Sequence, residues 1–199
     1  RDRMVVSHQT HTVNLRRVTL EDAGKGVIRE RDYRDIDGLI TDVPGLTLVT
    51  FYADCVPLYF VDEKHKAIGL AHSGWRGTAD GMGEKMLKRM AEEYGTDPAD
   101  VKAAIGPSIG GCCFQVDKPV VDIFRNNFSF ADKYIRDDET FPGKYKIDLW
   151  GINRRMLMEQ GVREENIEVG GECTMCRPDM FYSHRVMGEA RGTMAAFLF

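Results

Sequence analysis

Short apolar runs alternate along the chain with longer segments in which apolar residues recur every three or four positions. The runs are rich in β-branched residues and predict strands at 46–51, 56–61, 67–71, 101–105, 167–170 and 193–199. The periodic segments predict helices at 79–94, 118–128 and 148–160, each flanked by an aspartate or a glycine suited to a helix end. No repeat or flexible linker interrupts this mixture, which predicts a single domain over residues 1–199. Val5 and Val6 resemble the interior of a strand, so we expect residues to be missing before the start of the sequence.

Composition and charge exclude several classes of function for this chain. The net charge of −4 provides no general attraction for nucleic acid or for an anionic membrane. No apolar run is long enough to span a bilayer, and no signal peptide is visible. Five cysteines, an odd number, argue against a secreted disulfide framework. We therefore predict a protein of a reducing, cytoplasmic compartment with no nucleic-acid or membrane partner.

The candidate chemistry begins at a predicted hairpin, in which two apolar strands flank a polar turn. A turn centred between Glu63 and Lys64 places Cys55 directly opposite His72, where paired Cβ atoms lie about 5 Å apart. Pro57 has no N–H for the ladder, so we expect an edge or a bend at the cysteine end.

A thiolate beside an imidazole supports two chemistries. The two groups can share a zinc or copper ion, or His72 can deprotonate Cys55 for nucleophilic attack. A buried cysteine that happens to lie near a hydrogen-bonded histidine gives the same pattern. The spacing alone leaves all three alternatives open.

An anion site is indicated directly after the hairpin, in residues 74–78. Glycines around Arg76 at a helix start would combine free N–H groups, the helix dipole and a guanidinium group. We predict that Arg76 and Gly77 hold a phosphate or carboxylate, the alternative being a simple turn with a solvated arginine. Arg185 and Arg191 either contact the same anion or are surface charges.

Three further groups of residues are less informative. His8 and His11 are three positions apart, so on a strand at most one of them can join the site. Cys112 and Cys113 are adjacent, and we expect them to point in different directions and not to share a metal ion. The C-x-x-C motif at 173–176 lacks a second pair at suitable spacing and a thioredoxin-like context, so we assign it no function.

Five motifs, taken together, resemble the YfiH/YlmD/laccase-domain family, long described as polyphenol oxidases and later as purine nucleoside-cleaving enzymes. The ordered set spans nearly the whole chain and is more specific than any one motif. The motifs are Gln-Thr-His at 9–11, Ala-Asp-Cys-Val-Pro-Leu at 53–58, Ala-His-Ser-Gly-Trp-Arg-Gly at 71–77, Gly-Pro-Ser-Ile-Gly with Cys-Cys-Phe at 106–114, and Tyr-Ser-His-Arg at 182–185.

The resemblance implies a mixed α/β (α+β) fold with a central pair of mixed sheets and flanking helices. It implies that the metal ligands are His11, Cys55 and His72, which resolves the choice between His8 and His11. It also implies phosphorolysis of purine nucleosides (adenosine, inosine, guanosine, methylthioadenosine) and hydrolytic deamination of adenosine, with nucleoside and phosphate as small-molecule partners. The family usually carries a segment before the first motif, in line with the expected truncation.

The sequence therefore predicts a zinc enzyme, because zinc with three protein ligands can activate water. One alternative is copper-dependent, laccase-like phenol oxidation, for which five histidines are few. Another is a metal-free hydrolase with Cys55 as nucleophile and His72 as base. The last is a metal-binding scaffold without activity.

Overall fold

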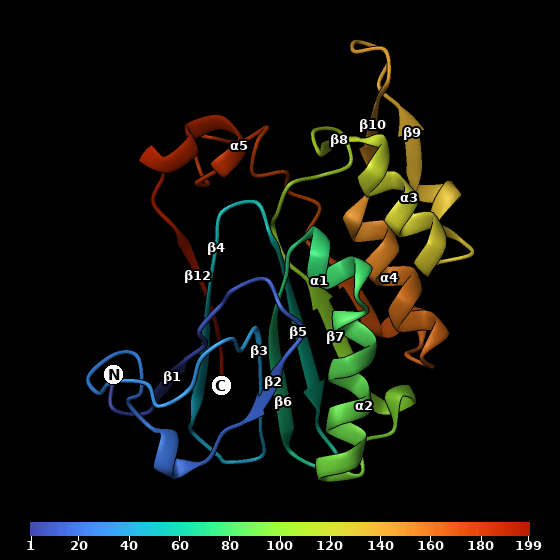
Figure 1. The fold of residues 1–199 in the computed structure, drawn as a ribbon. Coiled ribbons are helices and arrows are strands. Elements are labelled where there is room, and N and C mark those ends of the chain that lie inside the picture. The colour runs from blue at the N-terminus through green and yellow to red at the C-terminus, as the bar shows by residue number, and fades with distance from the viewer.

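A computed structural model describes residues 1–199 and arranges the strands in three sheets (Figure 1). The largest is a six-stranded mixed sheet, built from β2 (Leu15–Arg17), β3 (Gly38–Thr41), β5 (Val56–Asp62), β6 (Ala67–Ser73), β7 (Lys102–Ile105) and β11 (Ile167–Val169). Its strands lie in the order β11-β7-β5-β6-β3-β2. A three-stranded sheet contains β1 (Met4–Val6), β4 (Thr47–Tyr52) and β12 (Met194–Leu198), and another contains β8 (Gln115–Asp117), β9 (Ile135–Asp137) and β10 (Lys144–Ile147).

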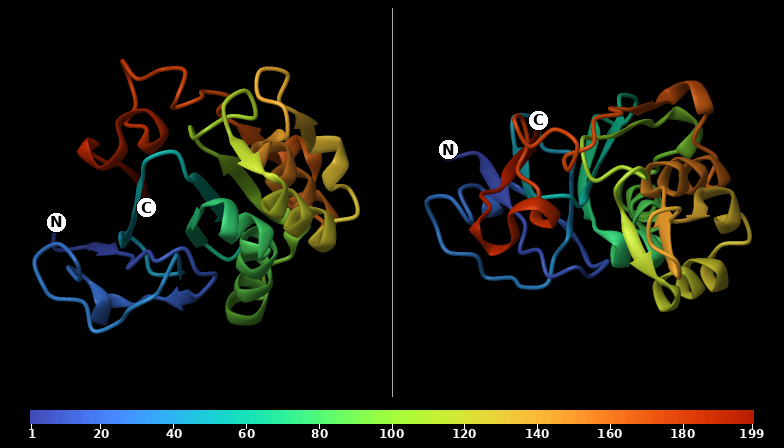
Figure 2. Two further views of the ribbon diagram at one scale, coloured as in Figure 1. Left: turned by 45° about the horizontal axis from the view of Figure 1, so that its top comes forward. Right: turned by 90° about the horizontal axis from the view of Figure 1, so that it is seen from above.

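The first four helices along the chain pack on one face of the six-stranded sheet, and the β1-β4-β12 sheet covers the other (Figure 2). None of the helices is both long enough and apolar enough to cross a membrane. The helices are α1 (Trp75–Ala79), α2 (Met82–Tyr94), α3 (Lys118–Asn127), α4 (Leu149–Glu159) and α5 (His184–Met187).

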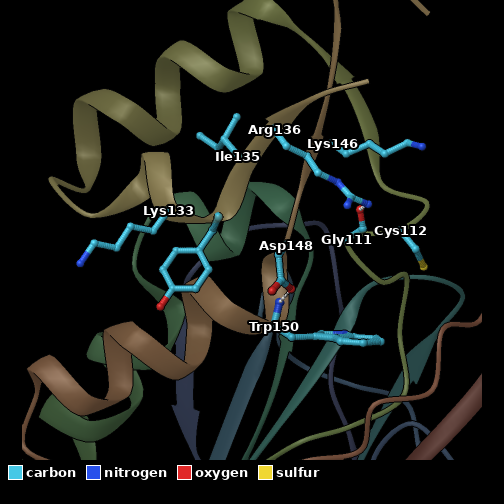
Figure 3. Close-up of a pocket in the computed structure, with 9 residues that line it drawn as sticks. Gly111, Cys112, Lys133, Ile135, Arg136, Lys146, Asp148 and Trp150 are labelled. Carbon is cyan, nitrogen blue, oxygen red and sulfur yellow. Dashed lines mark hydrogen bonds between the residues drawn. The ribbon is translucent and has the colours of Figure 1, made fainter. Parts of the chain in front are cut away.

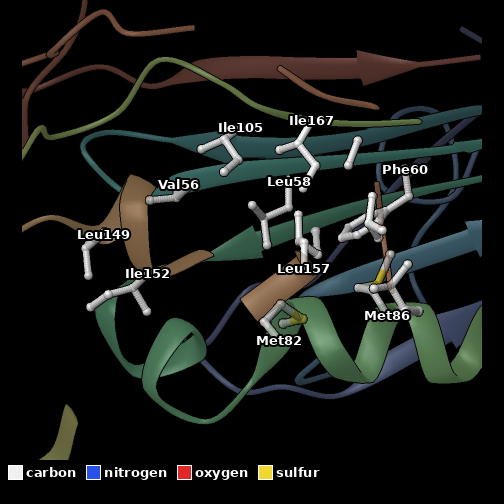
Figure 4. Packing of buried hydrophobic residues seen from close by; sticks show 14 of the residues in the cluster. Val56, Leu58, Phe60, Met82, Met86, Ile105, Leu149, Ile152, Leu157 and Ile167 are labelled. Atoms are coloured by element: carbon white, nitrogen blue, oxygen red, sulfur yellow. The ribbon is translucent and has the colours of Figure 1, made fainter. Parts of the chain in front are cut away.

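Each face of the six-stranded sheet has its own apolar cluster, because successive side chains on a strand point to opposite faces. Phe60 of β5 belongs to the larger cluster with Met82 and Met86 of α2 (Figure 4). Leu39 and Leu70 belong to the smaller cluster, which is shared with the β1-β4-β12 sheet. The central strands are therefore buried on both faces, which explains their continuous apolar runs.

The mixed α/β class predicted from the sequence is confirmed, and each predicted strand corresponds to an observed one: β4, β5, β6, β7, β11 or β12. The predicted helices at 118–128 and 148–160 correspond to α3 and α4. The predicted helix at 79–94 is wrong at its start, because Gly81 has a left-handed backbone (φ +78°) that separates α1 from α2. The short or polar strands β2, β3, β8, β9 and β10 were not predicted.

The predicted β5–β6 hairpin is present, but its register differs by two residues from the prediction. Four residues, 63–66, form the turn, and Lys66 adopts a left-handed backbone (φ +53°). The Asp62 carboxylate accepts a hydrogen bond from the His65 amide at 3.0 Å. This turn is two residues longer than predicted, so each β5 residue pairs with a β6 residue two positions further along the chain.

Pro57, and not Cys55, therefore lies directly opposite His72. A shift of two residues keeps every side chain on its original face, so Cys55 still lies on the same side as His72. Of the edge or bend expected at the cysteine end, the bend is present at residues 53–55, and the edge is absent because β5 runs between β6 and β7. Pro57 precedes Leu58, the first β5 residue in the β7 ladder, so its missing N–H removes no bond from that ladder.

Phe60 gives a direct test of this core. Its side chain is fully buried, so Phe60→Ala should lower the free energy of unfolding by about 3–5 kcal/mol, measured by urea denaturation. Phe199, which is 85% exposed, is the matched control, and Phe199→Ala should change stability by less than about 0.5 kcal/mol. Equal effects of the two substitutions would contradict the packing described here.

Candidate metal centre and substrate pocket

The three residues predicted as metal ligands come together at one end of the six-stranded sheet. His11 lies in the loop after β1, Cys55 lies just before β5, and His72 lies near the end of β6. Their candidate ligand atoms all lie within 4.8 Å of one another, and His11 Nε2 is 3.8 Å from Cys55 Sγ. His8 lies apart from this group, and its Nδ1 accepts a hydrogen bond from the Asp35 amide.

A buried carboxylate, Asp37, positions both histidines. Its Oδ1 lies 2.7 Å from His72 Nδ1, which leaves Nε2 of His72 as the nitrogen available to a ligand. The same carboxylate accepts hydrogen bonds from the amides of Thr10, His11 and Thr12 and from the Thr12 hydroxyl. Asp37 therefore connects the His11 loop to β6.

The backbone around the three candidate ligands allows them to lie close to one another. His11 and Asp54 both have left-handed backbones, with φ of +65° and +82°, which is uncommon for residues other than glycine. Gly74 faces the ligands, and a Cβ atom there would lie 3.0 Å from Cys55 Sγ and 3.1 Å from His11 Cδ2. A larger residue at Gly74 would thus crowd two of the candidate ligands.

The electrostatics of the group favour a thiolate next to an imidazolium. Burial raises the pKa of Cys55, but hydrogen bonds from His11 and His72 outweigh this effect and lower the pKa to about 7. Burial lowers the pKa of His72, whereas the hydrogen bonds to Asp37 and Cys55 raise it to about 9. A nearly neutral thiol pKa makes Cys55 suitable both as a metal ligand and as a nucleophile.

The donor set fits a single zinc ion. Two imidazole nitrogens and one thiolate are ordinary zinc ligands, and three protein ligands are typical of catalytic sites that also bind water or substrate. His11 and Cys55 both line the neighbouring cavity, so an ion held here would face that cavity. The Asp37–His72 hydrogen bond supplies the second partner that metal-binding histidines usually have.

The cavity beside these ligands has a volume of about 390 Å³ and is rich in arginine. Arg76, Arg185 and Arg191 line it, and its one acidic residue is Asp54. The Asp54 carboxylate already accepts hydrogen bonds from the Thr174 hydroxyl and from the Arg185 amide. The cavity is therefore locally cationic in a chain of net negative charge. Its other lining residues are mostly apolar: Ala53, Trp75, Ile109, Phe114 and Leu149, with His184 at the side.

Not all of the residues that the sequence predicted to bind an anion line the cavity. Arg76 and Arg185 line the cavity, whereas Gly77 is buried in α1 and is not among its lining residues. A Cβ at Gly77 would instead contact the carbonyl oxygens of His72 and Thr12. Because α1 is only five residues long, the positive character of the cavity rests on guanidinium groups rather than on a long helix dipole.

Sequence reasoning missed Asp37 and Asp54, whose roles depend on contacts far along the chain. Asp37 lies among charged residues just before β3, a short strand that was itself not predicted. Asp54 directly precedes Cys55, and that adjacency was a signal available in the sequence. Its bonds to Thr174 and Arg185 were not visible there, because 120 or more residues separate the partners.

Comparison with known proteins places these features in a family context. Residues 1–199 match the family described as "Multi-copper polyphenol oxidoreductase laccase". The chain is 39% identical over 198 residues to a Bacillus subtilis protein named purine nucleoside phosphorylase YlmD, covering 98% of this chain and 69% of that protein. It is 32% identical to a protein of an unknown prokaryotic organism named adenosine deaminase RL5, covering 96% of this chain and 72% of the relative.

A solved structure shows the same fold. The crystal structure of the Bacillus licheniformis protein YfiH matches with a TM-score of 0.93 and 38% sequence identity. The match covers 98% of this chain and 73% of the YfiH chain. The family resemblance drawn from the five motifs is therefore confirmed.

The role of Asp37 in metal binding can be tested by Asp37→Asn. An amide cannot accept all of the hydrogen bonds that the carboxylate receives, so the variant should bind zinc about 10–100-fold more weakly in competition with a chelator. Asp35→Asn is the matched control: Asp35 is exposed, has a backbone that asparagine also tolerates (φ +54°), and accepts one hydrogen bond, from the Thr10 hydroxyl, that an amide oxygen can also accept. Unchanged zinc affinity in Asp37→Asn would show that this carboxylate does not support the ligands.

Proposed function

The chain belongs to the multi-copper polyphenol oxidoreductase laccase family, and on that premise we propose that it is a zinc-dependent purine nucleoside phosphorylase that also deaminates adenosine. The observation that supports this most is the cavity in which two of the three candidate metal ligands meet three arginines. Relatives named purine nucleoside phosphorylase and adenosine deaminase support the same choice. Five free cysteines suit a reducing cytoplasm.

Phosphate binding is assigned to the three arginines of the cavity. The Arg76 guanidinium lies over the Trp75 ring, 4.4 Å from its centroid, which limits its motion while its N–H groups stay available. Arg185 uses one terminal nitrogen to hold the Gln115 carbonyl, which leaves the other for a ligand. Nε of Arg191 is buried without a partner in the protein. Guanidinium groups pair with phosphate oxygens through strong, often bidentate, hydrogen bonds.

Nucleoside binding is assigned to the apolar part of the same cavity. Trp75, Ile109, Phe114 and Leu149 offer faces against which a purine can stack. The volume of about 390 Å³ lies within the range of small-molecule sites. Phosphate and nucleoside would thus lie side by side, as a transfer of the ribosyl group to phosphate requires.

The chain's own residues would prepare the reacting groups. Asp37 fixes the tautomer of His72, and Cys55 contributes a thiolate at neutral pH. A bound zinc ion would supply Lewis acidity and lower the pKa of water, which is the chemistry that hydrolytic deamination needs. His184, which also lines the cavity, is an imidazole able to exchange a proton with the purine.

Laccase-like chemistry receives less support from the side chains. Several copper ions need many histidine ligands, and the chain has five histidines in total. His8 is bonded to the backbone of Asp35, and His65 is paired with Asp62 in the hairpin turn. His11, His72 and His184 remain near the cavity, which suits one ion better than a copper cluster.

The activity itself is tested by incubating zinc-loaded protein with adenosine and phosphate and identifying the products. We expect adenine with ribose 1-phosphate, and inosine as the product of deamination. Cys55→Ala removes one candidate ligand and should abolish both activities together with zinc binding at the His11–Cys55–His72 group. If chelation leaves turnover unchanged while alkylation of Cys55 stops it, the metal-free hydrolase replaces this proposal; no turnover at all would reject the function.

Phosphate recognition is tested separately by Arg76→Ala. Loss of a hydrogen bond to a charged group, worth about 1.5–3 kcal/mol, should reduce kcat/KM for phosphate about 10–100-fold. Deamination uses no phosphate and should fall much less. Arg154→Ala is the matched control, because Arg154 lies on α4, pairs with Glu164 and is not among the cavity residues. Equal losses of both activities would assign Arg76 a structural role.

A further inference from the structure

A second group of potential metal ligands lies outside the substrate cavity and is made entirely of cysteine. The Sγ atoms of Cys112, Cys113, Cys173 and Cys176 all lie within 4.8 Å of one another. Cys176 Sγ is 3.4 Å from that of Cys113 and 3.7 Å from that of Cys112. All four thiols are free. Together with Cys55, they account for every cysteine in the chain.

The distances match one tetrahedral ion. With Zn–S bonds of about 2.3 Å, two sulfurs of a tetrahedral site lie about 3.8 Å apart. The observed separations of 3.4 and 3.7 Å lie close to this value. A disulfide, in contrast, requires about 2.05 Å and joins only two of the four. An iron–sulfur cluster would hold its cysteines farther apart, because several iron atoms lie between them.

Two tight turns bring the four thiols together and explain why Cys112 and Cys113 do not point apart as expected. The amides of Cys113 and Phe114 both bond to the Gly110 carbonyl, so the chain turns at the adjacent cysteines instead of running as a strand. Alternation of side chains, which would separate Cys112 from Cys113, applies only to extended chain. The amide of Cys176 likewise bonds to the Cys173 carbonyl. The second pair that the C-x-x-C motif needs is therefore the adjacent Cys-Cys pair.

The backbone beside the cluster favours a thiolate at Cys173. The Gly110 amide donates a hydrogen bond to Cys173 Sγ at 3.2 Å, which stabilises negative charge on that sulfur. A Cβ at Gly110 would lie 3.2 Å from Cys112 Sγ and 3.3 Å from Cys173 Cβ, so glycine leaves room for the cluster. Cys112 also opens onto a cavity of about 360 Å³.

That cavity carries positive charge beside the cluster. Lys133, Arg136 and Lys146 line it together with Cys112 (Figure 3). Arg136 donates to the carbonyl of Gly111, the residue directly before the cysteine pair, at 3.1 Å. Four thiolates around a divalent cation carry two net negative charges, and the Arg136 guanidinium beside Gly111 offsets part of that charge.

The first turn forms part of the substrate cavity, and the second turn contacts one of the cavity's residues. Ile109 and Phe114 flank the adjacent cysteines in sequence and line that cavity. Thr174, between the other two cysteines, donates to the Asp54 carboxylate next to Cys55 at 2.6 Å. Neighbouring parallel strands, β7 and β11, lead into the two turns. A link between the turns would therefore hold one wall of the cavity in place.

From these contacts we propose that Cys112, Cys113, Cys173 and Cys176 form a second, structural metal site that binds one zinc ion through four thiolates. Binding forms four Zn–S bonds and releases the thiol protons to solvent, with no change in oxidation state. The ion fastens the turn after β7 to the turn after β11. This site is separate from the His11–Cys55–His72 group and does not depend on the proposed nucleoside chemistry.

The test measures metal content and is independent of activity. Protein purified under reducing conditions and loaded with zinc should contain two ions per chain by elemental analysis. The double variant Cys112→Ser/Cys176→Ser should retain one ion, and so should Cys55→Ser, which leaves the four-cysteine group intact. The proposal is overturned if the unsubstituted protein contains one ion and Cys55→Ser contains none. It is also overturned if the intact mass is lower by two hydrogens, which would reveal a disulfide.

Cobalt substitution gives a second readout that needs no folded double variant. In the unsubstituted protein, Co²⁺ should give strong sulfur-to-cobalt charge-transfer absorption with the visible bands of tetrahedral thiolate coordination. Cys55→Ser should keep most of this absorption, because four of the five cysteines remain. Absorption that disappears with Cys55 would place the only thiolate-bound ion at the other site and reject the proposal.

Discussion

The buried carboxylate of Asp37 is the constraint on which the candidate metal centre depends. It is fully buried, and taking such a charge out of water costs several kcal/mol. Five hydrogen bonds to a charged acceptor converge on it and compensate for that cost. Burial raises the pKa of Asp37, but the hydrogen bond from His72 and those from the Thr10–Thr12 segment dominate and lower it.

This arrangement makes the loop and the sheet depend on one another. The Asp37 carbonyl also accepts the His72 amide at 2.8 Å, so the residue bonds to β6 through both its backbone and its side chain. Its remaining bonds hold the amides around His11, whose left-handed backbone is unfavourable in isolation. The positions of two candidate ligands are therefore set by one residue that is not itself among the candidate ligands.

Much of the fold follows from local patterns, but the site depends on long-range contacts. Continuous apolar runs predicted β4 to β7 because those strands are largely buried. The hairpin also predicted that Cys55 and His72 lie close together. This prediction holds despite the two-residue error in register, because side chains on a strand return to the same face every two residues. Strands such as β9 and β10 carry polar residues and lie in a small sheet beside α3, so they lack the apolar run on which strand prediction relies. The role of Asp37 was invisible for a similar reason, since its partners are 25 to 35 residues away.

The two cysteine-containing centres of the chain differ in their ligand atoms and therefore in the roles they can have. Three ligands with two imidazoles, next to an arginine-rich cavity, leave room for a substrate at the ion. Four thiolates close the coordination sphere and serve to hold chain segments together. Asp54 connects the two centres, since its backbone leads into Cys55 and its carboxylate accepts the Thr174 hydroxyl from within the C-x-x-C turn. A rigid four-cysteine site would thus fix one wall of the cavity, while Asp37 fixes the positions of His11 and His72, and the substrate would bind against preorganised residues.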